Sequence, residues 1–435
     1  MGYLDAMRRA PTNPDAEPSV PAIMAPPVQK DHPLTRSPAG LAGLVFLALM
    51  LLASLGSLPF TLTGPDGTPR YNAGSPREGR LPPAWAPHDE GDIDRLVLAV
   101  QGRASDDPKV GARVDAIASE AGLTVDELFE QREGPAFKRL LDLAPSPLLG
   151  TDLLGRSLLI RVLTGGGISL GIGIAAAMLS VFIGTLYGAI AGYAGGMIDA
   201  SMMRVVDILY GLPYILLVVL LAVAVDAAVE GWAADRVARF SAQREAYVEA
   251  ALSEAPGETT DERRAELERE ALAAIGSGEL GSASQNAVNV VTLLVAIGGV
   301  SWLTMARVIR GQVLSLKNQP FVEAARAIGA PTRRIFGRHL LPNLLGPVIV
   351  YATLAVPQAI LQESFLSFLG IGVKPPLPSW GNLAAEGLSE LNPYKSHWWL
   401  LFFPCLLLGL TLLALNFVGE GLREAFDPRR ARRGA

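Results

Sequence analysis

Long apolar runs alternate with polar segments along the 435 residues of this chain. A helix that crosses a membrane needs about 20 mostly apolar residues. Runs of about that length recur six times, at roughly 41–59, 165–191, 208–226, 286–306, 344–369 and 397–418. The pattern therefore predicts an all-α integral membrane protein with six transmembrane helices.

Polar segments separate these runs and define the expected domains. In chain order we expect an N-terminal tail at 1–40, a first transmembrane helix at 41–59, an insertion at 60–160, a main membrane domain at 161–422 and a basic tail at 423–435. The main domain contains a second insertion, 227–285, and a basic loop, 307–343. The first span begins after about 40 polar, Pro-rich residues, which is too late for a standard signal peptide, so we interpret it as an uncleaved anchor.

Arginine and lysine gather in alternate polar segments. They precede the first span, separate the second from the third and the fourth from the fifth, and follow the sixth, as Arg8, Arg9, Lys30, Arg36, Arg204, Arg307, Arg310, Lys317, Arg326, Arg333, Arg334, Arg338, Arg423, Arg429, Arg430, Arg432 and Arg433. Cytoplasmic loops of membrane proteins carry an excess of these residues. We therefore expect both termini and 307–343 in the cytoplasm, and 60–160 and 227–285 on the exported side.

The composition supports a membrane protein and gives no sign of an enzyme. Hydrophobic residues make up 50% of the chain and charged residues 18%, whereas a soluble domain carries about 25% charged residues. The single cysteine, Cys405, excludes an internal disulfide, and the four histidines have no metal-ligand spacing. The sequence contains no HExxH, GxSxG or GxxxxGK[ST] motif. We therefore expect no catalytic residue, metal or cofactor in this chain, and any ATP must be bound by another subunit.

The predicted spans contain almost no ionisable residues. Asp226, Glu363 and Glu420 lie at or near their ends. A carrier coupled to protons or sodium normally places carboxylates or histidines at the middle of the membrane. A secondary transporter or a channel that works without an ATPase is therefore the weaker alternative, and a membrane scaffold for the exported insertions is weaker still.

Small residues follow one another at four-residue intervals in the second span, as Ser180, Gly184, Gly188 and Gly192. Such a stripe allows the backbones of two helices to approach closely. It is compatible with packing inside the subunit and with a contact between subunits, and the sequence leaves both open.

The two exported insertions have helical patterns. In 60–160, Thr124 stands three residues before Glu127, the spacing of a capping box. In 227–285, Pro256 and Gly257 break a helical pattern, and Thr259 with Glu262 can cap the next helix, which predicts a helical hairpin. The many charges of these helices indicate either a solvated face or a docking surface for an exported partner.

The basic loop contains a helix–glycine–helix pattern, "EAARAIGAPTRRIFGRHLLPN" at 323–343. Pro320 suits the first turn of a helix, and Gly329 suits a left-handed C-terminal cap with positive φ, after which Pro331 begins a second helix. The helical spacing places two apolar sets on one face each: Phe321, Ala324, Ala325 and Ile328, then Thr332, Ile335, Phe336 and His339. A DNA-binding helix pair cannot reach a duplex from between two spans. Two interpretations remain: an amphipathic loop on the membrane surface, and a rigid element that docks on a cytoplasmic motor.

Several motifs of this chain resemble one family of membrane proteins. The loop resembles the EAA loop of ABC-importer permeases through Glu323, Ala324, Ala325, Gly329, Ala330, Arg333, Arg334 and Pro342. "RHLLPN" (338–343), "LLGTDLLGRSLLIRVL" (148–163), "ESFLSFLGIGVKPPLPSWGNLAAEG" (363–387) and "NFVGEGLREAFDPR" (416–429) are similar to the dipeptide, oligopeptide and nickel importer branch. In the second motif Ser157 replaces the usual Asp. The third contains Pro378, Trp380 and Gly381, an exported loop before the last span.

The resemblance implies a C-type permease subunit with the type I ABC importer transmembrane fold. It also implies a second homologous permease, two cytoplasmic ATPase subunits that bind the ATP, and an exported solute-binding protein. The expected location is the inner membrane of a bacterium, in contact with lipid and without nucleic acid. The expected cargo is peptides or related small solutes, moved by alternating access. The insertions at 60–160 and 227–285 are longer than the family's usual exported loops.

Overall fold

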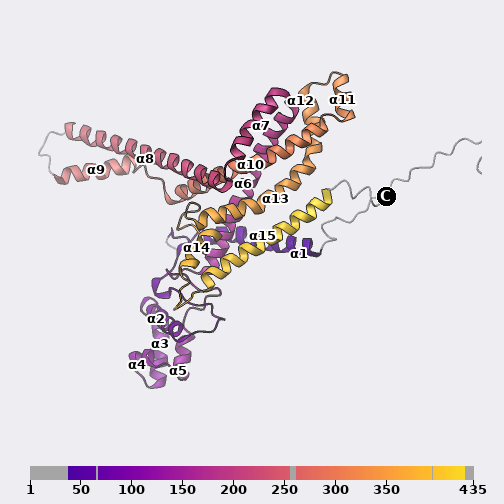
Figure 1. The fold of residues 1–435 in the computed structure, drawn as a ribbon. Coiled ribbons are helices and arrows are strands. Elements are labelled where there is room, and N and C mark those ends of the chain that lie inside the picture. Colours follow the sequence, from indigo (N-terminus) through magenta and orange to yellow (C-terminus); the bar gives the residue numbers. More distant parts are fainter. Residues whose placement is uncertain (1–37, 65–66, 255–260, 394, 427–435) are drawn as a thin grey trace, which may run out of the picture.

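The computed structural model describes residues 38–64, 67–254, 261–393 and 395–426 (Figure 1). Within these ranges the regular structure is helical, with two isolated β-bridges. Six of the described helices are long and apolar enough to cross a membrane, at Gly40–Thr61, Leu158–Ala194, Tyr214–Ser253, Ala283–Leu316, Thr332–Phe368 and Trp399–Arg423. The predicted all-α fold with six transmembrane helices is confirmed.

The membrane helices are α1 (Pro38–Thr61), α6 (Leu158–Ala194), α8 (Tyr214–Glu254), α10 (Ser282–Leu316), α13 (Leu341–Phe368) and α15 (Trp399–Phe426). The shorter helices are α2 (Glu90–Asp106), α3 (Pro108–Ala121), α4 (Val125–Glu130), α5 (Pro135–Leu141), α7 (Gly196–Tyr210), α9 (Asp261–Ile275), α11 (Pro320–Ala327), α12 (Thr332–Ile335) and α14 (Trp380–Ser389). Single turns lie at η4 (Arg70–Asn72), η5 (Pro76–Glu78) and η6 (Phe336–Leu340).

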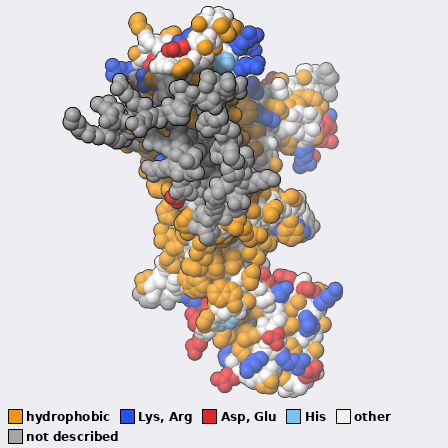
Figure 2. Space-filling model, turned by 90° about the vertical axis from the view of Figure 1, so that its right-hand side faces the viewer, with side chains coloured by type: hydrophobic (Ala, Val, Ile, Leu, Met, Phe, Trp, Pro, Cys, Tyr) orange, Lys and Arg blue, Asp and Glu red, His pale blue; other side chains and the backbone are white. Residues whose placement is uncertain are grey.

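Helix α6 forms the centre of the bundle and packs on α1, α10 and α13. Buried residues of α6, α10 and α13, among them Ile172, Ile297 and Ala359, form one core cluster. Figure 2 shows hydrophobic side chains gathered over the middle of the molecule and charged side chains gathered at its two ends. This distribution is the one that a lipid bilayer requires of a helical bundle.

The third predicted span, 208–226, has different bounds in the structure. Residues 208–210 belong to α7, which ends at Tyr210, and a new helix begins after Pro213 because proline has no N–H to continue the ladder. This helix, α8, then continues for 41 residues to Glu254 without a break at 226. The helix therefore extends beyond the predicted end of the span at 226, because the sequence there is Ala-rich and continues a helix readily.

The second insertion forms the predicted helical hairpin. Helix α9 packs back along α8 through Val248, Leu267 and Ala271, and the pair projects from the side of the bundle (Figure 1). Residues 255–260, which contain the predicted breaking and capping residues Pro256, Gly257 and Thr259, lie outside the described residues.

The first insertion is a small helical unit with a core of its own. Helices α2 to α5 surround Val100, Val114, Leu128, Phe137 and Leu140. The predicted capping box is confirmed, since the Glu127 amide donates to the Thr124 hydroxyl and the Thr124 amide to the Glu127 carboxylate. This unit lies at one end of the bundle, and α11 and α12 lie at the opposite end (Figure 1).

Candidate functional site

Residues 320–340 form a turn between two helices, which we call the elbow. Pro320 occupies the first turn of α11, as predicted. Gly329 has a φ of +75°, also as predicted, and no atom would lie within 4 Å of a Cβ placed there. The Gly329 amide donates to the Arg326 carbonyl (2.9 Å) and the Ala330 amide to the Ala325 carbonyl (3.0 Å). These are the two hydrogen bonds of a Schellman motif, so the backbone sets the angle of the turn.

The elbow is seated on the ends of α6 and α10. Val322, Ala325, Ile335 and Leu340 are buried and pack against residues of those helices, which are Ala189, Met305, Ile309 and Val313. The Arg326 guanidinium lies over the Tyr193 ring, 5.8 Å from its centroid. A movement of the elbow must therefore move α6 and α10.

The outer face of the elbow is exposed. Ile328 is 84% and Phe321 41% exposed, and Glu323, Ala324, Arg333, Arg334 and Pro342 are exposed beside them. Of the apolar set Phe321, Ala324, Ala325 and Ile328, only Ala325 packs on the bundle, because Val322 provides the other inward contact. The rest of the set forms an apolar outer surface with charges around it.

The second short helix is not a separate element. Helix α12 passes through the π-helical turn η6 straight into α13, so the elbow is continuous with the fifth membrane helix. Phe321 and His339 lie across the elbow with ring centroids 6.2 Å apart. This continuity connects the exposed elbow directly to a membrane helix.

Ion pairs hold the helix ends beside the elbow. Arg310 of α10 binds the Asp199 carboxylate of α7 with two hydrogen bonds, of 2.5 and 2.7 Å. The bond from Arg310 lowers the pKa of Asp199 below its usual value. Lys317 donates to the Gly192 carbonyl at the end of α6, at 2.8 Å. The α6–α7 turn is thereby fixed to the helix that carries the elbow.

The stripe of small residues in α6 faces α10 of the same chain. The Ser180 hydroxyl lies 3.2 Å from the Gly298 carbonyl. A Cβ on Gly184 would lie 2.5 Å from Met305 Cβ, one on Gly188 would overlap the Ala306 carbonyl oxygen, and one on Gly192 would lie 2.9 Å from the Arg310 carbonyl oxygen. Packing inside the subunit accounts for all four residues.

The loop before the last span is buried at the other end of the bundle. The Trp380 side chain is fully buried, and its indole donates to the Val162 carbonyl of α6 at 3.2 Å. Pro378 is buried, and a Cβ on Gly381 would overlap the Ser364 carbonyl oxygen of α13. Ser379 and Asn382 form a capping box that starts α14. The predicted loop residues therefore seat α14 between α6 and α13.

Glu363 lies five residues before the end of α13, near the end of its span as the sequence suggests, and is fully buried. Ser364 and Ser367 donate to its carboxylate, at 3.2 and 2.8 Å. The Ser367 hydroxyl also accepts from the Val373 amide at 3.0 Å. Glu363 and Ser367 thus connect α13 to the loop that follows it.

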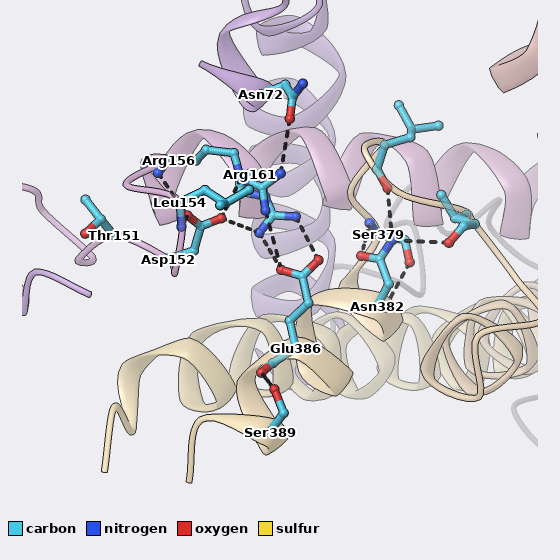
Figure 3. Close-up of polar contacts among 12 residues, drawn as sticks. Asn72, Thr151, Asp152, Leu154, Arg156, Arg161, Ser379, Asn382, Glu386 and Ser389 are labelled. Atoms are coloured by element: carbon cyan, nitrogen blue, oxygen red, sulfur yellow. Dashed lines mark hydrogen bonds and ion pairs between the residues drawn. The ribbon is translucent and has the colours of Figure 1, made fainter. Parts of the chain in front are cut away.

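A second set of residues, which we call the latch, was not predicted from the sequence (Figure 3). It consists of Asp152, Arg156, Arg161 and Glu386. Arg161 donates to Asp152 at 2.7 Å and to both Glu386 oxygens, at 2.6 and 3.0 Å. Arg156 donates to Asp152 at 2.6 Å. The latch joins the start of α6 to α14. The signal in the sequence is Arg161 itself, a charged residue four residues before the predicted start of the second span at 165.

The first insertion docks on the segment between α14 and α15 through reciprocal charges. Arg80 binds Glu390 with bonds of 2.7 and 3.0 Å. Lys395 binds Asp89 and Asp92, both at 2.9 Å. Arg95 lies 2.6 Å from the Nε2 atom of His397. The insertion is therefore fixed to the membrane domain.

Six membrane helices, an exposed helical elbow at one end and a buried loop at the other define a membrane permease subunit, and comparison with known proteins places it in a family. The family model of binding-protein-dependent transport system inner membrane components matches residues 184–432. The chain belongs to this family. It is a multi-pass inner-membrane subunit of an ABC transport system, a transport component and not a catalytic chain. In such systems ATPase partners handle the ATP, a binding protein delivers the solute, and a second permease completes the membrane part.

Three relatives illustrate the similarity. The oligopeptide transport system permease protein OppC of Haemophilus influenzae is 41% identical over 280 residues, which cover 64% of this chain and 70% of that protein. The dipeptide transport system permease protein DppC of Bacillus subtilis is 39% identical over 280 residues, 64% of this chain and 68% of that protein. The oligopeptide transport system permease protein OppC of Escherichia coli is 40% identical over 290 residues, which cover 66% of this chain and 74% of that protein.

Proposed function

We propose that this chain is one of two homologous permeases of an ATP-driven peptide importer, with two cytoplasmic ATPases and an exported binding protein. The cargo assignment is supported by the relatives, whose names specify oligopeptide and dipeptide transport. It is also supported by the four motifs shared with the dipeptide, oligopeptide and nickel branch.

The observation that carries the proposal is the construction of the elbow. Its inner face is packed on α6 and α10, its outer face is exposed and partly apolar, and its far end runs into α13. An ATPase bound to Phe321, Glu323 and Ile328 would therefore pull on three membrane helices at once. ATP shifts the permease between outward-open and inward-open states because it binds more tightly to the ATPases in one of them.

The same architecture supports a proposed orientation in the membrane. The elbow, with Arg333 and Arg334, lies at one end of the bundle, and the first insertion lies at the other (Figure 1). If the basic elbow end is cytoplasmic, then 60–160 is exported and both termini are cytoplasmic. The hairpin at 227–285 projects sideways, and we place it on the exported side, in contact with the binding protein or the partner permease.

Uptake by the purified complex tests this function. The chain with its partner permease, ATPases and binding protein is placed in proteoliposomes, and uptake of a mixture of alanine peptides of two to five residues is measured by mass spectrometry. We expect uptake only with ATP and the binding protein together. Uptake by this chain alone, driven by an ion gradient and without ATP, would instead establish a secondary transporter.

Cysteine labelling tests the orientation separately. In a Cys405→Ala background, single cysteines at Ser253 and at Arg334 are labelled in intact cells with a reagent that cannot cross the membrane. We expect Ser253→Cys to react and Arg334→Cys to react only after lysis. The opposite pattern would refute the orientation without affecting the family.

A further inference from the structure

A cavity of about 810 Å³ opens at the end of the bundle that carries the first insertion. Its wall consists of residues 62, 67–69, 71 and 72 of that insertion, the first turns of α10, Ile168 of α6 and the loop 374–377. Cavities of about 300–1,000 Å³ are typical of sites for small organic ligands. The volume therefore suits a short peptide.

Side-chain amides dominate the polar lining. Gln285, Asn286 and Asn289 lie on the first turns of α10 at spacings of three and four residues, and so share one face of the helix. Asn72 lines the cavity from the insertion, and its Oδ1 atom accepts a hydrogen bond from Arg156 at 3.1 Å. Tyr71 lies on the same wall. The three amides of α10 each carry two N–H donors and a carbonyl acceptor, and Asn72 contributes its two N–H donors.

Charge is nearly absent from the wall. Among the described residues around the cavity, Lys374 is the one charged side chain, and its ammonium group is bound to the Asp226 carboxylate at 2.8 and 3.0 Å. Ile168, Val290 and Leu377 give apolar surface between the amides. A lining of neutral donors and acceptors with apolar patches matches a peptide backbone of any sequence, because every residue presents the same N–H and C=O groups.

We propose that this cavity is the exported vestibule of the permease, in which the amides of Asn72, Gln285, Asn286 and Asn289 bind the backbone of a peptide released by the binding protein. The assignment rests on the proposed peptide import and adds the residues that receive the cargo. Neutral hydrogen bonds to the backbone hold the peptide weakly and without regard to its side chains, as a translocation pathway requires.

The test uses the complete complex in proteoliposomes with the alanine peptides of two to five residues. In the double variant Gln285→Leu/Asn289→Leu, amides are replaced by apolar groups of similar size. We expect peptide uptake to fall at least fivefold while the ATPase activity stimulated by the loaded binding protein stays within twofold of the wild type. The matched control is Gln131→Leu. It removes an exposed amide of the first insertion that does not line the cavity, and it should leave peptide uptake and ATPase activity unchanged.

Photo-cross-linking gives a second readout. With p-benzoylphenylalanine at position 285, radiolabelled trialanine should become attached to this chain in the presence of ATP. Undiminished uptake in the double variant would overturn the vestibule while leaving peptide import intact. A second result would also overturn the vestibule. If the double variant loses ATPase stimulation as well as uptake, and the cross-link forms with the binding protein, then the wall is a docking surface for that protein. No peptide uptake by the wild-type complex would refute the proposed function, and the vestibule with it.

Discussion

Arg161, in the first turn of α6, donates two hydrogen bonds to the Glu386 carboxylate of α14 and a third to Asp152. Its side chain is 1% exposed, whereas that of Glu386 is 40% exposed. A buried guanidinium is stable only when it is paired and hydrogen-bonded. The latch is therefore a fixed link between the central helix and α14, which precedes α15.

Removal of the buried end of the latch should destabilise the protein. Arg161→Leu should reduce the free energy of unfolding by about 1.5–3 kcal/mol, because hydrogen bonds to charged groups are lost in a buried place. The matched control is Arg139→Leu, which removes a bond of 2.6 Å to Glu120 between two exposed side chains and should cost about 0–1 kcal/mol. The midpoint of thermal unfolding in nanodiscs measures the loss of stability in each of the two variants. Equal shifts would show that the latch is not a structural link.

Docking of the first insertion should weaken at mildly acidic pH. Burial lowers the pKa of His397 below its ordinary value, and the nearby charges of Arg95 and Arg80 lower it further against the opposing effect of Glu390. When the insertion undocks, His397 recovers a pKa near 6.5. The undocked form then binds more protons, so docking is complete above about pH 6.5 and weakens as the pH falls below it.

Hydrogen exchange of α2, corrected for its intrinsic pH dependence, checks this. Exchange should accelerate between pH 7.5 and 5.5 in the wild type. His397→Gln keeps a donor and an acceptor but cannot titrate, so it should remove the acceleration. His88→Gln, at an exposed histidine of the insertion, should retain it. If exchange still accelerates in His397→Gln, then another titratable group causes the pH dependence.

The close packing of α6 on α10 predicts a sharp difference between two glycines of one helix. In Gly188→Val the new side chain would overlap the Ala306 carbonyl, whereas in Gly171→Val no atom lies within 4 Å of the new Cβ. Gly188→Val should cost at least about 1–3 kcal/mol. Size-exclusion profiles and thermal unfolding in detergent separate the two variants. Identical behaviour would refute the packing role of the stripe.

Removal of the hairpin tip should impair transport but not assembly. The Arg244 guanidinium donates to the Gly276 carbonyl at 2.6 Å, so residues 244 and 276 lie next to each other. Deletion of 245–275 can therefore be closed with a short Gly/Ser bridge. We expect normal co-purification of the ATPases and reduced peptide uptake, because the proposed function places the hairpin in contact with the binding protein or the partner permease. Full uptake would make the hairpin an accessory feature.

Local features of this protein were predictable from its sequence. Six membrane helices follow from apolar length, and the positive φ of Gly329 follows from a glycine at a helix end. The capping box of α4 follows from the spacing of Thr124 and Glu127. In each case neighbouring residues alone determine the conformation.

Features that depend on distant contacts were not predictable. Arg161 and Glu386 are 225 residues apart in the sequence, and only the folded bundle pairs them. The spacing of Phe321, Ala325 and Ile328 gave an apolar face of α11, but the position of α11 on α6 and α10 decides which face is buried. The continuity of α8 past 226 depends on the absence of a breaking residue, which hydropathy does not measure.

The central claim is that the elbow couples the permease to its ATPases, and Gly329 and Glu323 test it. Gly329→Val places a β-branched residue at a φ of +75°, at a cost of about 1–3 kcal/mol, and so distorts the turn. Glu323→Lys reverses an exposed charge in the first turn of α11, where the local helix-dipole effect is only about 0.3–1 kcal/mol. A large effect of Glu323→Lys on coupling must therefore come from the contact between the elbow and the ATPase.

The decisive measurement is co-purification of the ATPases with these two variants, together with peptide uptake by the complexes. The controls are Gly409→Val, at a helical glycine with open space, and Glu133→Lys, at an exposed residue of the first insertion. We predict that both elbow variants insert into the membrane but lose ATPases during purification or hydrolyse ATP without uptake, while the controls behave as the wild type. Normal co-purification and normal uptake in both elbow variants would contradict the account.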